Sequence, residues 1–278
     1  MHNATKGPSW IRKLLLMAGL AIWTGSVSVS SFAAESRPSG DGDSAQEKRT
    51  GRDTGRQKQP APLPVEHETR PIEGWTVRVD KRLLAPPHQT RGELALKVLT
   101  ARLTVITVVV PQPALDRLRK IPIQLDLTHG RLRSMQYHPS AKWLKDNGYS
   151  ENLAKCAHIP DIEQFLSPYE TYRQPWAVLH ELAHAYHHQM FDWNDPRIRA
   201  AYERFKAGGR YESTLFVTGK HTRHYALTDE KEFFAEMTEC YFGVNDFFPF
   251  VTGELKQEEP GIFDLMREIW GPLPERKE

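Results

Sequence analysis

The stretch His180-Glu181-Leu182-Ala183-His184 decides how the rest of the chain is interpreted. An α-helix advances about 100° and 1.5 Å per residue, so side chains four positions apart lie on one face, about one turn from each other. Two imidazoles with this spacing can bind one Zn²⁺ at roughly 2.0–2.1 Å, and Glu181 can act as general base toward water. The pentad therefore predicts zinc as cofactor and hydrolysis, above all of peptide bonds, as chemistry.

The residues around the pentad favour a helix over 175–190. Pro175 suits a first helical turn. Apolar residues recur at spacings of three and four and predict a buried stripe beside the histidines: Trp176, Val178, Leu179, Leu182, Ala183, Tyr186 and Met190. The alternative is an ordinary amphipathic helix whose two histidines bind no metal.

A catalytic zinc ion needs a third protein ligand. A metzincin would have Gly at position 187 and His at 190, whereas this chain has His187 and Met190, which disfavours that class. The better donor is a carboxylate on a later helix, which we expect to begin near residues 228–230 and to stop at Gly243. Glu232 is the candidate because it opens the segment Glu232-Phe233-Phe234-Ala235-Glu236.

The pentad, together with Tyr225 and the Glu232-Phe233-Phe234-Ala235-Glu236 segment that follows it after six intervening residues, resembles the catalytic domain of anthrax lethal factor and its bacterial relatives. These are gluzincin zinc peptidases, and the resemblance covers roughly residues 170–245. It implies a zincin-like domain with Glu181 as catalytic base and Tyr225 assisting at the transition state. It implies three zinc ligands: His180, His184 and Glu232. The best-known member cleaves host kinases using additional domains for which this chain has no room, so that substrate is not carried over.

Glu236 lies one helical turn beyond Glu232 and has two interpretations. It could accept a hydrogen bond from the non-metal nitrogen of a ligating histidine and so fix the tautomer of the ring. Alternatively it is a carboxylate in the N-terminal half of a helix, favoured by the helix dipole. The apolar neighbours Phe233, Phe234 and Met237 indicate close packing, so we favour the first interpretation.

The other histidines near these motifs are weaker candidates. For His187 and His188 we expect solvent-facing positions or contacts behind the ligands, because three ligands are already assigned. His221 and His224 flank Tyr225 and could line a substrate cleft, but solvated loop positions are the default interpretation.

Composition divides the chain into three parts. Basic residues, an apolar run over 14–23 and small residues ending at Ala33 predict an export signal over 1–33, too short to span a bilayer. Residues 34–70 are polar and rich in Pro and Gly, which predicts a disordered linker or pro-segment. Residues 71–278 suit a single catalytic domain. The mature protein is therefore expected to be secreted or periplasmic, without a membrane span.

Two cysteines and a nearly balanced charge limit the partners. In an oxidising compartment Cys156 and Cys240 could form a disulfide or remain separately buried thiols. The formal net charge is +2 and basic residues are scattered among acids, so nothing indicates nucleic acid as a partner. We expect a peptide or protein substrate.

The local patterns predict an α+β domain with a mixed sheet. Strands are expected at 74–80, 103–110, 121–127 and 131–138, and helices at 91–100, 113–120, 140–147 and 161–167. A helix is the alternative for 103–110. If the strand over 131–138 lies at the sheet edge beside the active-site helix, its backbone could pair with an extended peptide; an ordinary paired strand is the alternative.

Three functions remain open from these residues. The first is an exported zinc metallopeptidase. The second is a secreted binding module that keeps the fold without turnover, although it would not require Glu181. The third is an amide hydrolase that acts on cell-wall peptides. No nucleotide-binding glycine pattern and no serine-hydrolase elbow is present.

Overall fold

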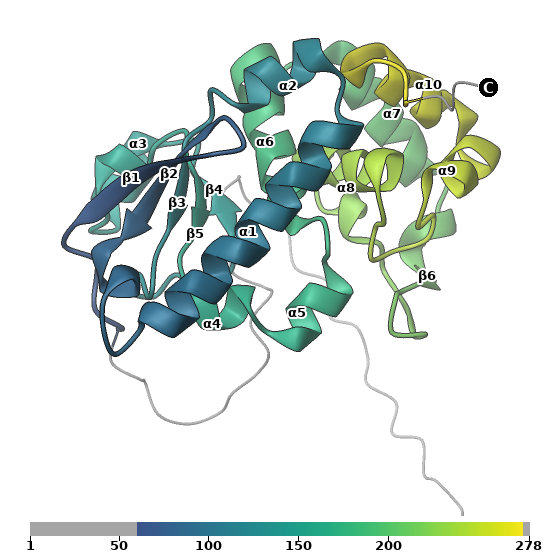
Figure 1. The fold of residues 1–278 in the computed structure, drawn as a ribbon. Helices are drawn as coiled ribbons and strands as arrows, with labels where there is room; N and C mark the ends of the chain where they lie inside the picture. Colours follow the sequence, from purple (N-terminus) through teal and green to yellow (C-terminus); the bar gives the residue numbers. More distant parts are fainter. Residues whose placement is uncertain (1–59, 275–278) are drawn as a thin grey trace, which may run out of the picture. The chain divides into compact units, whose positions relative to one another are not determined.

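The computed structural model describes residues 60–274, so the predicted export signal and residues 34–59 of the predicted linker lie outside the described residues. The described chain is a mixed α+β fold with a mixed sheet, as the sequence predicted (Figure 1). The strands are β1 (His67–Ile72), β2 (Trp75–Asp80), β3 (Ile123–Leu125), β4 (Gln136–Tyr137), β5 (Ala157–Ile159), β6 (Thr214–Leu215) and β7 (His221–Thr222). The helices are α1 (Gln89–Val109), α2 (Gln112–Leu118), α3 (Ala141–Asp146), α4 (Ile162–Phe165), α5 (Pro168–Arg173), α6 (Ala177–Phe191), α7 (Pro196–Ala207), α8 (Glu230–Phe242), α9 (Thr252–Glu258) and α10 (Pro260–Trp270).

The main sheet has five strands in the order β1-β2-β3-β5-β4. β2, β3 and β5 run parallel, while β1 and β4 are antiparallel to their neighbours. β4 is therefore the edge strand on the side where the sheet meets α6, which packs against both β4 and β5. This places the strand predicted over 131–138 at the sheet edge, although only residues 136–137 are strand.

The prediction of a strand over 103–110 is wrong, because residues 103–109 form the last two turns of α1 and Val110 is its C-cap. Leu99, Leu103 and Ile106 are buried and recur at helical spacings of four and three. Val105 is 46% exposed and Val108 is 70% exposed, on the opposite face. β-Branched residues only mildly disfavour a helix, and burial of one helical face outweighs that preference.

The remaining predicted elements near the sheet and the pentad are present, with different bounds. The expected strands over 74–80 and 121–127 correspond to β2 and β3, and the helix over 175–190 corresponds to α6. β1 begins at His67, so the folded domain starts before residue 71, and residues 67–70 belong to the sheet rather than to the linker.

Both cysteines are free and buried, so the disulfide alternative is not realised. Burial raises the pKa of the Cys156 thiol to about 12, and it raises the pKa of Cys240 further. Cys156 follows the turn before β5, whereas Cys240 lies in the last turn of α8.

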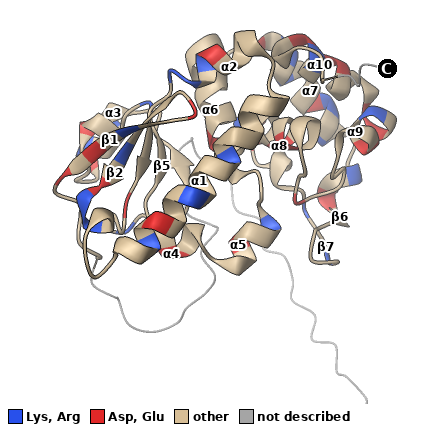
Figure 2. Ribbon diagram, viewed as in Figure 1, with Lys and Arg blue, Asp and Glu red and all other residues tan. Residues whose placement is uncertain are grey.

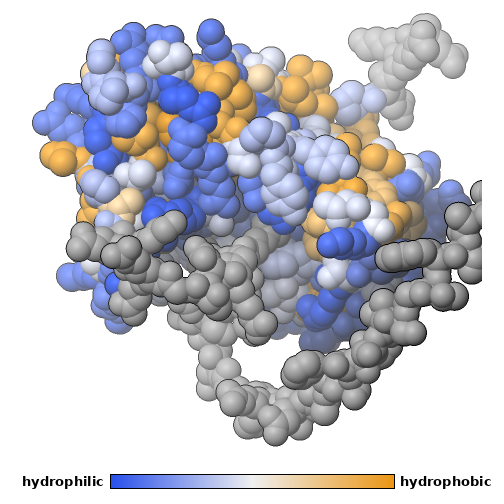
Figure 3. Space-filling view, turned by 90° about the horizontal axis from the view of Figure 1, so that it is seen from below, coloured by the Kyte–Doolittle hydropathy of each residue, from blue (hydrophilic) through white to orange (hydrophobic). Residues whose placement is uncertain are grey.

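The surface of the described residues mixes both signs of charge. Lys and Arg are interspersed with Asp and Glu over the ribbon (Figure 2), and pairs such as Arg91–Glu163 and Lys81–Glu66 join them. Apolar side chains lie in separate groups among hydrophilic ones on the face seen in Figure 3. Among residues 60–274, no helix has both the length and the apolar character that crossing a membrane requires.

Candidate metal centre

Helices α6 and α8 pack against each other and carry the predicted ligands. Asp229 caps α8 by accepting hydrogen bonds from the backbone N–H groups of Lys231 and Glu232, which fixes Glu232 in the first turn. At the other end, a Cβ on Gly243 would lie 1.9 Å from the Trp176 ring. Only glycine therefore permits the start of α6 to lie this close to the end of α8.

The three predicted ligands converge. His180 Nε2 lies 3.1 Å from Glu232 Oε2 and 3.1 Å from His184 Nε2, and His184 Nε2 lies 3.4 Å from Glu232 Oε2. A tetrahedral zinc site with bonds of 2.0–2.1 Å separates its ligand atoms by about 3.3 Å. The donor set and its spacing therefore fit a zinc ion held by two imidazoles and one carboxylate.

At His180, the hydrogen bond that we expected from Glu236 is made by Glu239. Glu239 Oε1 lies 2.6 Å from His180 Nδ1, whereas Glu236 Oε1 is 3.8 Å from the same nitrogen. Both carboxylates are buried. Glu232, Glu236 and Glu239 follow one another at spacings of four and three on one helix face, so Glu239 could have been found from the same pattern. The sequence alone does not decide between the two positions.

Glu181 is held by the edge strand. Its Oε2 accepts a hydrogen bond of 2.8 Å from the backbone N–H of Tyr137 in β4, and the side chain is buried. The Tyr137 hydroxyl lies 2.8 Å from His188 Nδ1, one turn beyond His184 on α6. The position of the predicted base is thus fixed both by its own helix and by β4.

Tyr225 also lies at the centre. It begins a 3₁₀ turn, η5 (Tyr225–Leu227), that packs against α8. Its hydroxyl donates a hydrogen bond of 3.0 Å to Glu232 Oε1, whereas the two histidines lie near Oε2 of the same carboxylate. The six residues between Tyr225 and Glu232 thus allow the phenol to reach the carboxylate.

Opposite charges in the metal centre outweigh the effect of burial on the pKa values of His180 and Glu232. Burial alone lowers the pKa of His180, but hydrogen bonds with Glu232 and Glu239 outweigh it and raise that pKa well above its usual value. Burial opposes ionisation of Glu232, yet the two imidazoles hold its pKa well below the usual value. Burial raises the pKa of Glu181, and the nearby histidines oppose that effect. Two negative carboxylates around His180 favour a cation at this position.

No protein-family model, curated protein or solved structure matches this chain. The resemblance to the lethal factor family and the zincin-like details of the fold therefore stay predictions. Function is inferred from the chemistry of the site.

The other histidines occupy more buried positions than expected. His187 is fully buried against the rings of Phe234 and Trp193, which excludes the solvent-facing alternative for it and leaves a position behind the ligands. His224 is also fully buried, and its Nδ1 accepts a hydrogen bond from the backbone N–H of Ala226. His221 is exposed, as expected of a loop residue.

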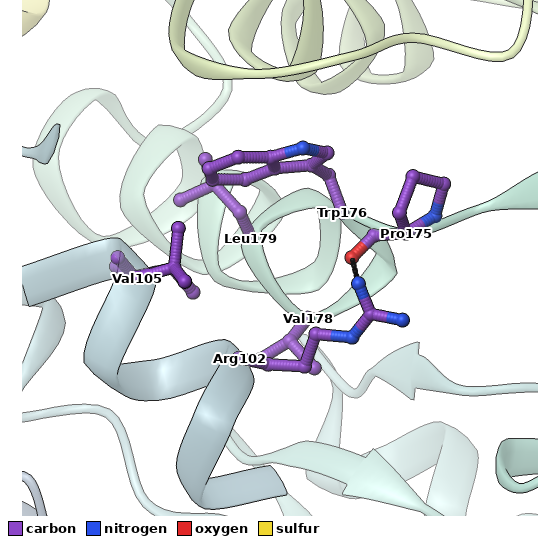
Figure 4. Close-up of a pocket in the computed structure, with 7 residues that line it drawn as sticks. Arg102, Val105, Pro175, Trp176, Val178 and Leu179 are labelled. Carbon is purple, nitrogen blue, oxygen red and sulfur yellow. Dashed lines mark hydrogen bonds between the residues drawn. The ribbon is translucent and has the colours of Figure 1, made fainter. Parts of the chain in front are cut away.

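A separate apolar pocket of about 240 Å³ lies between α1 and the start of α6 (Figure 4). Val105, Val178 and Trp176 contribute apolar walls, while the Arg102 guanidinium donates a hydrogen bond to the carbonyl oxygen of Pro175. None of the candidate metal ligands lines it. This pocket is therefore distinct from the metal centre.

Proposed function

We propose that this protein is an exported zinc-dependent metallopeptidase, with His180, His184 and Glu232 as the zinc ligands. The observation that carries the proposal is the convergence of these three donor atoms at 3.1–3.4 Å separations, with a buried glutamate adjacent to the first ligand. A zinc ion held there supplies Lewis acidity, which acidifies water and polarises a peptide carbonyl. A purely structural zinc site would not require Glu181.

Glu181 acts as the general base. The Tyr137 N–H donates to Oε2, and we assign the other oxygen, Oε1, to take the proton from the attacking water. The same carboxyl then passes the proton to the leaving amine. Because β4 holds one oxygen, the orientations open to the other are restricted, which lowers the entropic cost of the proton transfer.

Tyr225 stabilises the negative charge that develops on the carbonyl oxygen. In the structure its hydroxyl donates to Glu232 Oε1. We propose that this hydrogen bond positions the phenol before reaction, and that in the transition state the hydroxyl leaves Glu232 Oε1 and donates its single proton to the oxyanion. An extended substrate would pair with β4, because this strand lies at the edge of the sheet and contacts the base directly.

The decisive experiment compares Glu181→Gln with Glu203→Gln, a matched change at an exposed position of α7. We expect Glu181→Gln to keep its zinc and to lose at least 100-fold in the cleavage of a mixed peptide library. Glu203→Gln should cleave normally. Normal cleavage by Glu181→Gln would refute the assignment of the base.

A second variant tests the phenol. Tyr225→Phe should lower turnover with little change in zinc content, and an unchanged rate would reduce Tyr225 to a packing role. A wild-type protein that binds zinc yet cleaves neither general peptides nor cell-wall peptides would favour the binding module instead.

A further inference from the structure

A second group of histidines gathers around Asp126, which directly follows β3. Asp126 Oδ2 lies 2.6 Å from His129 Nδ1 and 2.8 Å from His158 Nε2. The three ligand atoms lie within 4.8 Å of one another, so one ion could contact all of them. Asp126 and His158 are completely buried and His129 is 4% exposed.

This group lies on the face of β4 and β5 opposite to α6. Successive side chains of a strand point to opposite faces. Tyr137 contacts His188 of α6 on one face, and the next residue, His138, contacts His158 on the other, with 3.0 Å between His138 Nε2 and His158 Nδ1. The Asp126 group is thus separate from the centre on α6 and α8.

Three nitrogens crowd around Asp126 Oδ2. Besides the two imidazoles, Gln124 Nε2 donates to the same oxygen over 2.9 Å. A carboxylate oxygen has about two lone-pair sites, so three nitrogens around one oxygen compete for them. A cation between the oxygen and the rings of His129 and His158 would relieve this crowding, because both rings would then present a lone pair to the ion. The contacts of 2.6 and 2.8 Å would open toward the separation of about 3.3 Å expected between zinc ligands.

The contacts that His158 and Asp126 make with residues outside the group are those expected of metal ligands. A ligating histidine usually makes a hydrogen bond through its other nitrogen, as His158 does with His138, and a ligating carboxylate usually accepts one as well. Asp126 Oδ1 lies 2.7 Å from His67 Nε2. Aromatic rings cover the group: Trp143 stacks on His138, and Tyr149 lies 5.6 Å from His129 between ring centroids.

We propose that Asp126, His129 and His158 bind a second divalent transition-metal ion, with zinc as the ion best suited to two imidazoles and one carboxylate. Because the group is buried on the far face of the sheet, its role is structural. The ion links the end of β3 to β5 and, through His138, holds the strand that carries the Tyr137 N–H. This proposal does not depend on the proposed function of the other centre.

The test counts zinc ions per chain by elemental analysis of the full chain after dialysis against dilute zinc. We expect two in the wild type, one in His129→Ala, one in His180→Ala and two in His221→Ala, an exposed control. Among residues 60–274, His180 belongs to both of the other groups that could hold a metal, so His180→Ala leaves the Asp126 group alone. One zinc in the wild type and none in His180→Ala would overturn the second site while preserving the first. One zinc in the wild type and none in His129→Ala would support the Asp126 site and overturn the centre on α6 and α8.

A second measurement covers the case in which His129→Ala does not fold. Co²⁺ is added to the His180→Ala variant, in which the Asp126 group is unaltered. One equivalent should produce the visible d–d absorption of a cobalt ion bound by nitrogen and oxygen. Absence of that absorption in the folded variant would overturn the proposal.

Discussion

Replacing Glu239 with Gln tests how the first zinc ligand is held. Glu239 Oε1 lies 2.6 Å from His180 Nδ1, and both side chains are at most 5% exposed. Gln keeps the shape and one acceptor oxygen but loses the charge. Hydrogen bonds to charged groups contribute about 1–1.5 kcal/mol more than neutral ones. Since about 1.4 kcal/mol is a factor of ten, we expect Glu239→Gln to bind zinc about tenfold more weakly.

Glu236→Gln is the matched control, because Glu236 is on the same helix face but 3.8 Å from the same nitrogen. It should change the zinc dissociation constant by less than about threefold, since at 3.8 Å its carboxylate makes no direct hydrogen bond with His180 Nδ1. The assay is competition for zinc with a chromogenic chelator, with unfolding of the metal-free proteins measured in parallel to remove folding effects. If Glu236→Gln weakened zinc binding as much as Glu239→Gln, the assignment of Glu239 as the partner of His180 would be refuted.

Three further predictions concern the fold. Leu103→Ala should lower the free energy of unfolding, measured with denaturant, by about 2–5 kcal/mol, whereas Val108→Ala should lower it by less than about 0.5 kcal/mol. The reason is that Leu103 is buried and Val108 is 70% exposed, so similar losses would contradict the helical register of α1. Native Cys156 and Cys240 should not react with a thiol reagent until the chain unfolds, since both are buried with raised pKa values, and rapid labelling of the native protein would argue against this packing. Burial lowers the pKa of His224 to about 3 from 6.5, so the unfolded state binds the extra proton and stability falls as the pH drops from 6.5 toward 3. His224→Asn should therefore reduce the slope of unfolding free energy against pH by about 1.4 kcal/mol per unit between about pH 4 and 6, and an unchanged slope would exclude His224 as the titrating group.

The sequence predicts the parts of the centre that local geometry determines. The i, i+4 spacing of His180 and His184 places both rings on one helix face whatever the rest of the chain does. Glu232 depends on tertiary packing, because it reaches the histidines only when α8 lies against α6. The choice between Glu236 and Glu239 depends on how far α8 is rotated and shifted along α6, and no local pattern fixes those quantities.

The Asp126 group was not predicted because no sequence period connects its members. His158 is separated from Asp126 by 32 residues in the chain. The parallel register of β3 with β5, which pairs Leu125 with Ile159, brings them together. Tertiary neighbours also decide the structure of 103–110. A run of β-branched residues suggests a strand, but it reveals neither its neighbours nor which of its faces is buried.

β4 connects the two groups of potential ligands. Only two of its residues pair with β5, so backbone hydrogen bonds alone would hold it weakly. Its position depends instead on side chains on both faces: the Tyr137 hydroxyl contacts α6, and the His138 ring contacts His158. The N–H that holds Glu181 belongs to this strand, so the orientation of the proposed base depends on the Asp126 group as well as on α6. Residues on the far face of the sheet therefore help to position the proposed active site.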